Sequence, residues 1–234
     1  MSTNWRQRMN ALGRLVLPAR CLLCGAPGCE TLDLCRACRN ELPWNTRACR
    51  RCGLPWEGGA GPDCGACRLS PPPFTRAHSP FCYSYPIDQL LPRFKFHGDL
   101  AAGALLATLM TWTLDPDQRP QALVPVPLHR SRLRARGYDQ ALELARALAH
   151  AGAPPVLANA LQRARPTRAQ SQLGAEARRG NVRGAFALRR GLQLPAHVAL
   201  VDDVMTTGAT VSECARVLLA GGVQRVDVWT VARA

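Results

Sequence analysis

The chain has few aromatic residues and no long apolar run. Aromatic residues make up 6% of its 234 positions, which leaves few rings on which the bases of a nucleic acid could stack. The apolar stretches 11–18 and 101–114 are too short to span a bilayer, and the first carries Arg14. No secretory signal is visible. The sequence therefore predicts a cytoplasmic protein without membrane insertion.

Acidic residues are also scarce, at 16 against 30 lysines and arginines, and the formal net charge is +14. The excess is concentrated between Arg130 and Arg190, where 13 arginines face three acidic residues. Such a segment favours a polyanionic partner, and diphosphate, a sugar diphosphate and nucleic acid all remain open. Lys95 is the only lysine, so we expect this position to require a compact ammonium group.

Cysteine, in contrast, is abundant: eight of the 11 cysteines form four CxxC pairs in the first third of the chain. In a reducing compartment, such pairs are typical of thiolate metal sites rather than disulfides. Consecutive pairs give two closed tetrahedral sites that suit structural Zn²⁺. A single zinc ion, a redox role and Cys29 as a substitute ligand are the alternatives. The predicted ligands are Cys21, Cys24, Cys35 and Cys38 for one ion, and Cys49, Cys52, Cys64 and Cys67 for the other.

The organisation follows the composition. A short basic helix is expected over 1–20, a cysteine-rich module over 21–70 in which metal replaces a core, a stiff proline linker at 71–73, and one larger domain over 74–234. In that domain strands are expected near 76–83, 122–126, 156–161, 198–201 and 225–231, and helices near 87–97, 100–113, 140–150 and 210–220. Alternating strands and helices predict an α/β fold with a mainly parallel sheet. Ligands of such a sheet bind at the carboxyl ends of its strands.

The segment 198–210, VALVDDVMTTGAT, carries the most specific pattern. An apolar strand runs into two carboxylates, Asp202 and Asp203, which can accept hydrogen bonds from vicinal ribose hydroxyls or hold Mg²⁺ through water. The backbone amides of the following loop and the next helix N-terminus favour a phosphate. We therefore expect a phosphorylated sugar here, and a turn without a ligand is the alternative. The predicted phosphate ligands are Thr206, Thr207, Gly208, Ala209 and Thr210.

Two arginine-rich segments complete the predicted site. VPVPLHRSRLRARGYDQ is expected to form a loop whose arginines bind diphosphate in bidentate fashion. The long polar segment 163–186 is expected to be a mobile lid with a short helix near 172–179, or else a disordered basic loop. The predicted sugar diphosphate contacts are Lys95, Arg130, Arg136, Gly137 and Gln140, and the predicted nucleic-acid contacts are Arg132, Arg134, Arg136, Arg165, Arg168, Arg178 and Arg179.

The DDxxTTGxT core resembles the 5-phosphoribosyl 1-diphosphate (PRPP) signature of type I phosphoribosyltransferases. Together with the four CxxC pairs, FKFHG and the two arginine-rich segments, it resembles the ComF family of competence proteins, including the GntX-type members, over nearly the whole chain from Cys21. The resemblance implies a double zinc ribbon joined to a type I phosphoribosyltransferase-like domain with a Rossmannoid parallel sheet. It also implies that Asp202 and Asp203 hold the ribose of Mg²⁺-bound PRPP, residues 206–210 its 5-phosphate and residues 130–140 its diphosphate.

Two functions follow from these observations and stay open. In the first, a PRPP-binding protein handles incoming single-stranded DNA in natural competence, with a competence helicase or recombination proteins as further partners. In the second, an active phosphoribosyltransferase works in nucleotide salvage without a DNA role, and Asp202 and Asp203 are catalytic. No residue identifies the acceptor. The candidate rings for stacking DNA bases are Trp44, Trp56, Phe94, Phe96 and Tyr138.

Overall fold

The computed structural model describes residues 18–29, 32–57, 61–165 and 182–234. Its internal contacts divide the chain into two units, Met1–Leu42 and Pro43–Ala234. The first unit holds two of the CxxC pairs and helix α2 (Arg36–Asn40). The second holds the other two pairs, helix α3 (Gly65–Leu69) and the β-sheet. The proline linker at 71–73 lies within this second unit.

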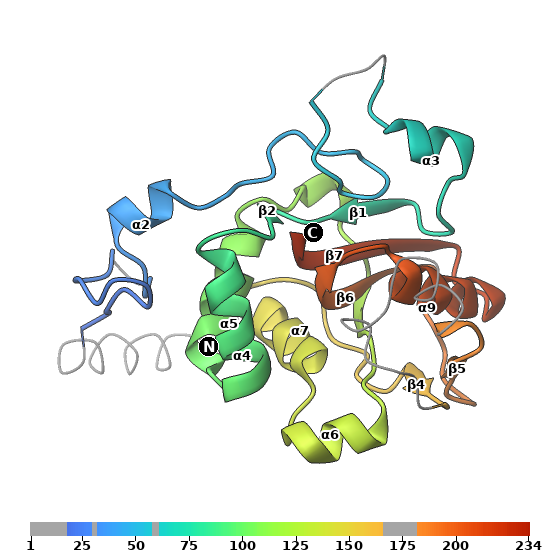
Figure 1. Cartoon of the computed structure of the whole chain (residues 1–234). Coiled ribbons are helices and arrows are strands. Elements are labelled where there is room, and N and C mark those ends of the chain that lie inside the picture. Colours follow the sequence, from blue (N-terminus) through green and yellow to red (C-terminus); the bar gives the residue numbers. More distant parts are fainter. Residues whose placement is uncertain (1–17, 30–31, 58–60, 166–181) are drawn as a thin grey trace, which may run out of the picture. The chain divides into compact units, whose positions relative to one another are not determined.

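The central sheet of the second unit is parallel throughout (Figure 1). Its strand order is β1–β7–β6–β3, and β2 pairs with the carboxyl end of β7. The strands are β1 (Arg76–His78), β2 (Phe81–Cys82), β3 (Ala122–Pro125), β6 (His197–Met205) and β7 (Arg225–Arg233). A separate antiparallel pair joins β4 (Leu161–Arg163) to β5 (Phe186–Leu188). The predicted α/β fold with a parallel sheet is confirmed.

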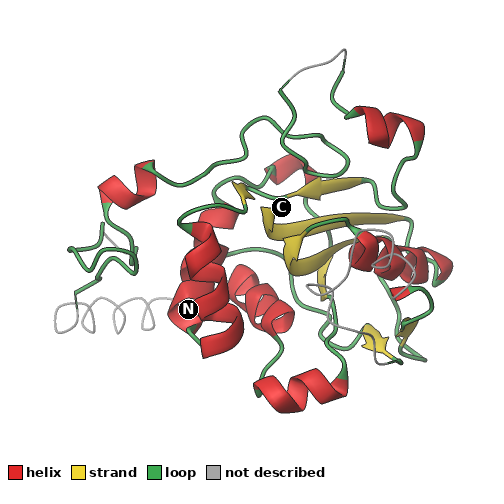
Figure 2. Ribbon diagram, viewed as in Figure 1, coloured by secondary structure: helices red, strands yellow, loops and turns green. Residues whose placement is uncertain are grey.

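Helices lie on both sides of the central strands (Figure 2). Helices α7 and α9 both pack on β6, α7 also contacts β3, and α9 also contacts β7 and β5. The helices of this unit, besides α3, are α4 (Ile87–His97), α5 (Leu100–Thr111), the 3₁₀ turn η1 (Pro116–Gln118), α6 (Arg130–Arg136), α7 (Gln140–His150) and α9 (Ala209–Ala220). Among the described residues, no helix has the length and apolar character that crossing a membrane requires.

The side chains of β6 alternate between the two faces of the sheet, and this alternation determines where its two aspartates point. Val198 and Leu200 belong to the hydrophobic core that includes the inner face of α9. Because successive side chains of a strand point to opposite faces, Asp202 lies on the same face as these two residues, and Asp203 lies on the opposite face. The adjacent pair therefore presents one carboxylate to each face of the sheet at its carboxyl edge.

Most predicted elements are confirmed, and four differ. The strand expected near 76–83 is divided into β1 and β2, which pair separately with β7. Residues 130–136 form helix α6 rather than a loop, since Arg side chains are compatible with a helix that Gly137 ends in a left-handed conformation. Strand β6 continues to Met205, because β7 pairs with it beyond Val201. The strand expected near 156–161 is reduced to one bridge between Val156 and Leu123, with β4 beginning at Leu161. Residues 1–17 of the helix expected over 1–20, and the whole helix expected near 172–179, lie outside the described residues; residues 18–20 are not helical, and Arg20 forms a bridge with Pro27.

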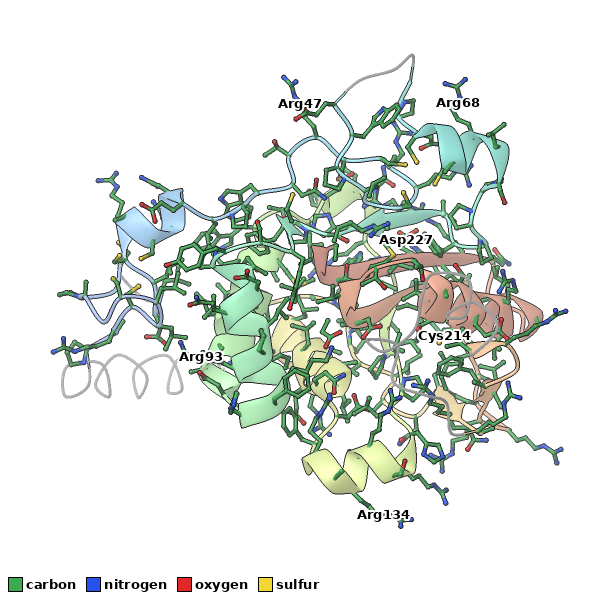
Figure 3. The ribbon with its side chains drawn as sticks, in the orientation of Figure 1. Arg47, Arg68, Arg93, Arg134, Cys214 and Asp227 are labelled. Carbon is green, nitrogen blue, oxygen red and sulfur yellow. The ribbon has the colours of Figure 1, made fainter. Side chains whose placement is uncertain are left out.

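The amino-terminal edge of the sheet contains a buried carboxylate, Asp227, in the interior of the domain (Figure 3). Its Oδ2 lies 2.9 Å from Nε2 of His197, 3.1 Å from Nη2 of Arg225 and 3.6 Å from Nε of Arg76. A fully buried carboxylate is stable only when such donors surround it. This cluster therefore ties β1, β6 and β7 together at the end opposite the aspartate pair.

We expect Asp227→Ala to lower the free energy of unfolding by about 3 kcal/mol, because it leaves partly buried cations without their partner. Asp115→Ala is the matched control, since its carboxylate is 43% exposed and lies 3.9 Å from the same Arg76. That change should cost less than about 1 kcal/mol. Chemical denaturation of both variants measures the difference, and equal losses would contradict a structural role for the buried cluster.

Candidate functional site

A cavity of about 540 Å³ opens at the carboxyl ends of β3 and β6. Residues from seven separate parts of the chain line it: the turn after β2, the end of α4, the exit of β3, helix α6 with the start of α7, β4, the end of β6 with the following turn and α9 start, and the last residue after β7. The charged and polar lining residues are Lys95, Arg132, Arg136, Gln140, Arg163, Asp202, Asp203, Thr206 and Thr210. The parallel sheet thus brings several of the residues singled out in the sequence to one place.

The aspartate pair is held in two different environments. Asp203 is buried, and its Oδ2 lies 2.6 Å from Nζ of Lys95. Burial would lower the pKa of Lys95, but the attraction of Asp203 outweighs it and raises that pKa, so Lys95 stays a cation. Burial, reinforced by the negative charge of Asp203, raises the pKa of Asp202 to about 8. At neutral pH Asp202 therefore holds its proton for much of the time, so it can donate as well as accept a hydrogen bond.

The Thr/Gly loop between β6 and α9 has the conformation that the sequence predicts for a phosphate loop. Gly208 is the N-cap of α9 and has φ 72°, a left-handed conformation that favours glycine. The first amides of an α-helix have no carbonyl partner within the helix, and an anion can accept hydrogen bonds from such amides. In this loop the amide of Ala209 donates to Oγ1 of Thr207 (3.4 Å). Thr206 and Thr210 line the cavity with the aspartates, whereas Thr207, Gly208 and Ala209 line a neighbouring cavity of about 890 Å³.

Helix α6 places its four arginines, which are two residues apart in the sequence, on two different faces. Residues four apart share one face of a helix, so Arg132 and Arg136 form one pair and Arg130 and Arg134 form another. The first pair lines the cavity. The second pair is exposed, and Figure 3 shows Arg134 pointing away from the domain. Arg130, predicted to bind the sugar diphosphate, is thus outside the cavity, and Arg132, predicted for nucleic acid, is inside it.

The surroundings of α6 fix its cavity-facing side chains. The Arg136 guanidinium donates to Oε1 of Gln140, a predicted site residue at the start of α7. Oδ1 of Asp139 accepts hydrogen bonds from the amides of Ala141 and Leu142, and Oδ2 accepts one from Leu128 on the opposite side of α6. Asp139 thereby closes the segment that begins at β3 into a compact turn. Gly137 ends α6 and does not line the cavity.

Two lining residues with polar side chains were not singled out in the sequence: Tyr83 and Arg163. Arg163 is the last residue of β4, and Tyr83 follows β2 directly. Their positions at the end of a strand, or directly after one, are the signal by which the sequence could have identified them as site residues. Phe96, a predicted stacking ring, follows the predicted Lys95 by one residue. Of the other predicted nucleic-acid contacts, Arg165 donates to the carbonyl oxygen of Arg183, and Arg168, Arg178 and Arg179 lie outside the described residues. Of the lid predicted over 163–186, residues 166–181 lie outside the described residues, and its two ends, Arg163 and Phe186, pair in the β4–β5 ladder.

The eight predicted metal ligands form two clusters of four, one in each unit. Within each cluster the sulfur atoms all lie within 4.8 Å of one another. A tetrahedral zinc ion with Zn–S distances of about 2.3 Å requires sulfur–sulfur separations of about 3.8 Å. The distances between Cys24 and Cys35 (3.6 Å) and between Cys52 and Cys64 (3.8 Å) agree with this geometry. Both clusters therefore suit structural zinc, and Cys29 belongs to neither.

The second cluster is joined directly to the sheet of its own unit. Nδ2 of Asn45 donates to the carbonyl oxygens of Gly53 (2.8 Å) and Ser79 (3.1 Å). At the end of β7, Nε of Arg233 donates to the carbonyl oxygen of Cys52 (3.1 Å), and its Nη1 donates to that of Met205 (3.0 Å). Met205 is the last residue of β6 before the Thr/Gly loop. Arg233 thus connects a metal-ligand knuckle to the start of the candidate phosphate loop.

Comparison with known proteins places this architecture in a family. A family model described as a double zinc ribbon domain matches residues 12–68, which include all eight clustered cysteines. The DNA utilization protein YhgH of Salmonella typhi is 34% identical over 226 residues, covering 94% of this chain and 99% of the relative. Competence protein F of Haemophilus influenzae is 34% identical over 224 residues, covering 92% and 97%. This chain belongs to the ComF family.

Membership of the ComF family accounts for both the cysteine clusters and the parallel sheet. The two cysteine clusters are the double zinc ribbon of the family, and the parallel sheet with its β6–loop–α9 unit is the phosphoribosyltransferase-like fold. A third relative, the YhgH protein of Escherichia coli (strain K12), is 33% identical with the same coverage as the Salmonella protein. The similarity therefore extends through the cavity-forming segments as well as the ribbon.

Proposed function

We propose that this protein binds PRPP with Mg²⁺ in the cavity and acts on single-stranded DNA during DNA utilization. The observation that carries the proposal is the convergence of an aspartate pair, two threonines of the Thr/Gly loop (Thr206 and Thr210) and two α6 arginines on one cavity, with the N-cap Gly208 between those threonines in the sequence. Each group suits a different part of the same ligand. The volume of the cavity, about 540 Å³, is within the range of small-molecule sites.

The parts of PRPP have natural partners in this arrangement. The 5-phosphate would accept hydrogen bonds from the loop amides at Gly208 and beyond, where the helix dipole favours an anion. The ribose hydroxyls would bind Asp202 and Asp203. The diphosphate would lie against Arg132 and Arg136, whose guanidinium groups offer paired donors. Asp202 and Asp203 would hold Mg²⁺ through its water ligands, and the ion would neutralise part of the charge of the diphosphate.

The same cavity offers what diphosphate departure from PRPP requires. Breaking the bond between the anomeric carbon and the diphosphate oxygen leaves positive charge on the ribose and negative charge on the leaving group. Asp203 would stabilise the first, and Arg132 with Arg136 the second. This supports an active transferase as the second candidate. Release of diphosphate from PRPP, assayed with and without candidate bases, separates a transferase from a protein that only binds PRPP.

The DNA part of the proposal is supported by the names of the relatives and by charge. The two relatives described above are named for DNA utilization and competence. The cavity carries Lys95, Arg132, Arg136 and Arg163, and phosphates of a single strand would bind such a group of cations with release of counterions. PRPP and DNA would then share part of one basic surface.

Calorimetric titration of the zinc-loaded protein with PRPP and Mg²⁺, repeated in the presence of oligo-dT, tests the proposal. We expect PRPP to bind, and oligo-dT to weaken that binding because both ligands need the cavity cations. Binding that oligo-dT does not affect would favour a transferase without a DNA role. Failure of PRPP to bind at all would overturn the assignment of the cavity.

The two faces of α6 provide a charge-matched test. Arg132→Ala with Arg136→Ala should weaken PRPP binding by roughly 100-fold, because each lost charge-assisted contact is worth about 1.5–3 kcal/mol. Arg130→Ala with Arg134→Ala removes the same charge from the exposed face of the same helix, and should change affinity less than about 3-fold. Calorimetry with PRPP and Mg²⁺ compares them. Equal losses would mean that net charge, rather than contact in the cavity, governs binding.

A further inference from the structure

Two aromatic rings that line the cavity are exposed. Phe96 is 61% exposed and Tyr83 is 40% exposed. An exposed phenylalanine forgoes the favourable free energy that burying its ring would bring, and single exposed apolar residues are unremarkable. Here, however, two rings from separate segments, α4 and the turn after β2, border the same charged cavity. The presence of two exposed rings and several cations in the lining of one cavity is what indicates a ligand.

Helix α4 forces Phe96 into this position. Phe94 is buried, and its ring packs so closely on Gly103 of α5 that a methyl group there would lie 2.5 Å from it. Lys95 reaches Asp203, and Phe96, two residues beyond Phe94, lies on the other side of the helix. The Arg136 guanidinium sits 5.1 Å from the centre of the Phe96 ring, and Nζ of Lys95 sits 5.9 Å from it. The ring is thus held at the border of the cavity between its cations.

The other predicted stacking rings are engaged in the fold. Trp44 packs on Phe81 with ring centres 4.6 Å apart, and Trp56 packs on the second cysteine cluster. The Tyr138 hydroxyl donates to the carbonyl oxygen of Phe94. Tyr85 and Trp112 are exposed, but neither lines the cavity. Of the aromatic residues described, Phe96 and Tyr83 combine exposure with a place beside the arginines.

We propose that Phe96 and Tyr83 form a nucleobase subsite, in which a base stacks on the rings while a phosphate next to it binds Arg132 or Arg136. This inference rests on the proposed function. It adds the base of the ligand to the phosphates that the cations recognise. Stacking on a ring is tolerant of base identity because every base has a π-face. A nucleotide carries a flat ring and an anion within one unit, which matches rings and guanidinium groups that line one cavity. The base can come from single-stranded DNA or from a free nucleotide.

The first test compares oligo-dT with an abasic oligonucleotide of the same length by fluorescence anisotropy. We expect the protein to prefer oligo-dT by roughly 10-fold, the size of one stacked base. Phe96→Ala and Tyr83→Ala should reduce that preference several-fold each, whereas Phe96→Trp should keep it. Trp112→Ala, which removes a ring 52% exposed outside the cavity, is the control and should leave the preference unchanged.

A second arm uses thymidine monophosphate, measured by calorimetry, to distinguish the two sources of the base. Oligo-dT binding that depends on Phe96 assigns the subsite to single-stranded DNA. Thymidine monophosphate binding that depends on Phe96, without oligo-dT binding, assigns it to a free nucleotide. Equal affinity of the protein for abasic and normal strands, or binding of both probes that Phe96→Ala leaves unchanged, overturns the subsite. So does binding of neither probe.

PRPP titration of the same variants keeps this inference separable from the proposed function. Phe96 and Tyr83 are assigned no contact with the ribose or the 5-phosphate, so the base preference and the PRPP affinity of each variant are measured as two separate quantities. Loss of base preference with retained PRPP binding supports the subsite. Absence of PRPP binding in the unmodified protein removes the proposed function while the oligonucleotide comparison still decides the subsite.

Discussion

Replacing Asp202 and Asp203 together with asparagine is expected to abolish PRPP binding. Loss of a charge-assisted hydrogen bond from Asp203 to the ribose costs about 1.5–3 kcal/mol, and loss of the hydrogen bond of Asp202 costs about 0.5–1.5 kcal/mol more, so the pair should lower affinity by roughly 100-fold. The change also removes the partner of Lys95, whose Nζ lies 2.6 Å from Asp203. That cation would then be free to pair with a ligand anion in a different place. Calorimetry with PRPP and Mg²⁺ measures the loss.

Separate controls show whether the loss is local. The double variant should keep its zinc content, because both cysteine clusters are built from other segments. Glu143→Gln with Asp117→Asn removes two carboxylates outside the cavity and should bind PRPP as the unmodified protein does. Retained PRPP binding in the Asp202 and Asp203 variant would contradict the proposed orientation of the ribose. Loss of PRPP binding in the Glu143 and Asp117 variant would point to net charge instead.

The β6–α9 segment could be predicted from the sequence because its information is local. Apolar residues at strand positions, two carboxylates and a Gly208 that requires positive φ all lie within 13 consecutive residues. Only the length of β6 differed. Asp202 and Asp203 have polar side chains typical of a loop, but β7 continues beside them and pairs up to Arg233. Pairing with a neighbouring strand, which sequence alone does not show, kept these residues in the strand.

The arginine-rich segment shows how a change of local structure changes a functional assignment. Arginines two apart in an assumed loop are equivalent, so all four seemed able to reach an anion. In helix α6 the same spacing sends Arg132 and Arg136 to one face and Arg130 and Arg134 to the other. Gly137, which ends the helix at φ 86°, was the sequence signal for this. Arg163 and Tyr83 line the cavity because segments that are distant in the sequence come together there, and no local pattern specifies such contacts.

The cysteine pairs were predictable as clusters, whereas their place in the architecture was not. Spacing alone gave four ligands for each site, and the structure brings those sulfur atoms together. Composition suggested that all eight belong to one module ahead of a proline linker. The contacts instead group the second cluster with the sheet. This grouping has a functional consequence, since it makes the two metal sites unequal.

Removing the second cluster's metal is expected to damage the sheet domain. Cys49→Ser with Cys52→Ser eliminates two ligands of a cluster in which Cys49, Cys64 and Cys67 are buried. A structural zinc site contributes about 10–16 kcal/mol to the folding of a small module. Its loss should release the knuckle and with it the contacts of Arg233 to Cys52 and Met205. We expect the melting temperature to fall by about 10 °C or more, and PRPP affinity to fall with it.

The first cluster supplies the matched control. Cys21→Ser with Cys24→Ser removes the same number and kind of ligands from the other unit. Because the cavity-lining residues all belong to Pro43–Ala234, this variant should keep the melting temperature of that unit and its PRPP affinity within about 3-fold. Metal analysis should give two zinc ions for the unmodified protein and one for each variant. A count below one zinc ion in the unmodified protein would reject the metal assignment itself.

Arg233 joins the second cysteine cluster to the end of β6, and its role can be tested separately from that of the metal ligands. If the knuckle positions the phosphate loop through this side chain, Arg233→Met should reduce PRPP affinity several-fold while keeping both zinc ions, because it cuts the hydrogen bonds to Cys52 and Met205 but leaves every ligand in place. The Cys49 and Cys52 variant would then combine that loss with the loss of stability. Equal behaviour of the two cysteine variants would contradict this coupling, since only the second cluster is joined through Arg233 to the residue that precedes the Thr/Gly loop.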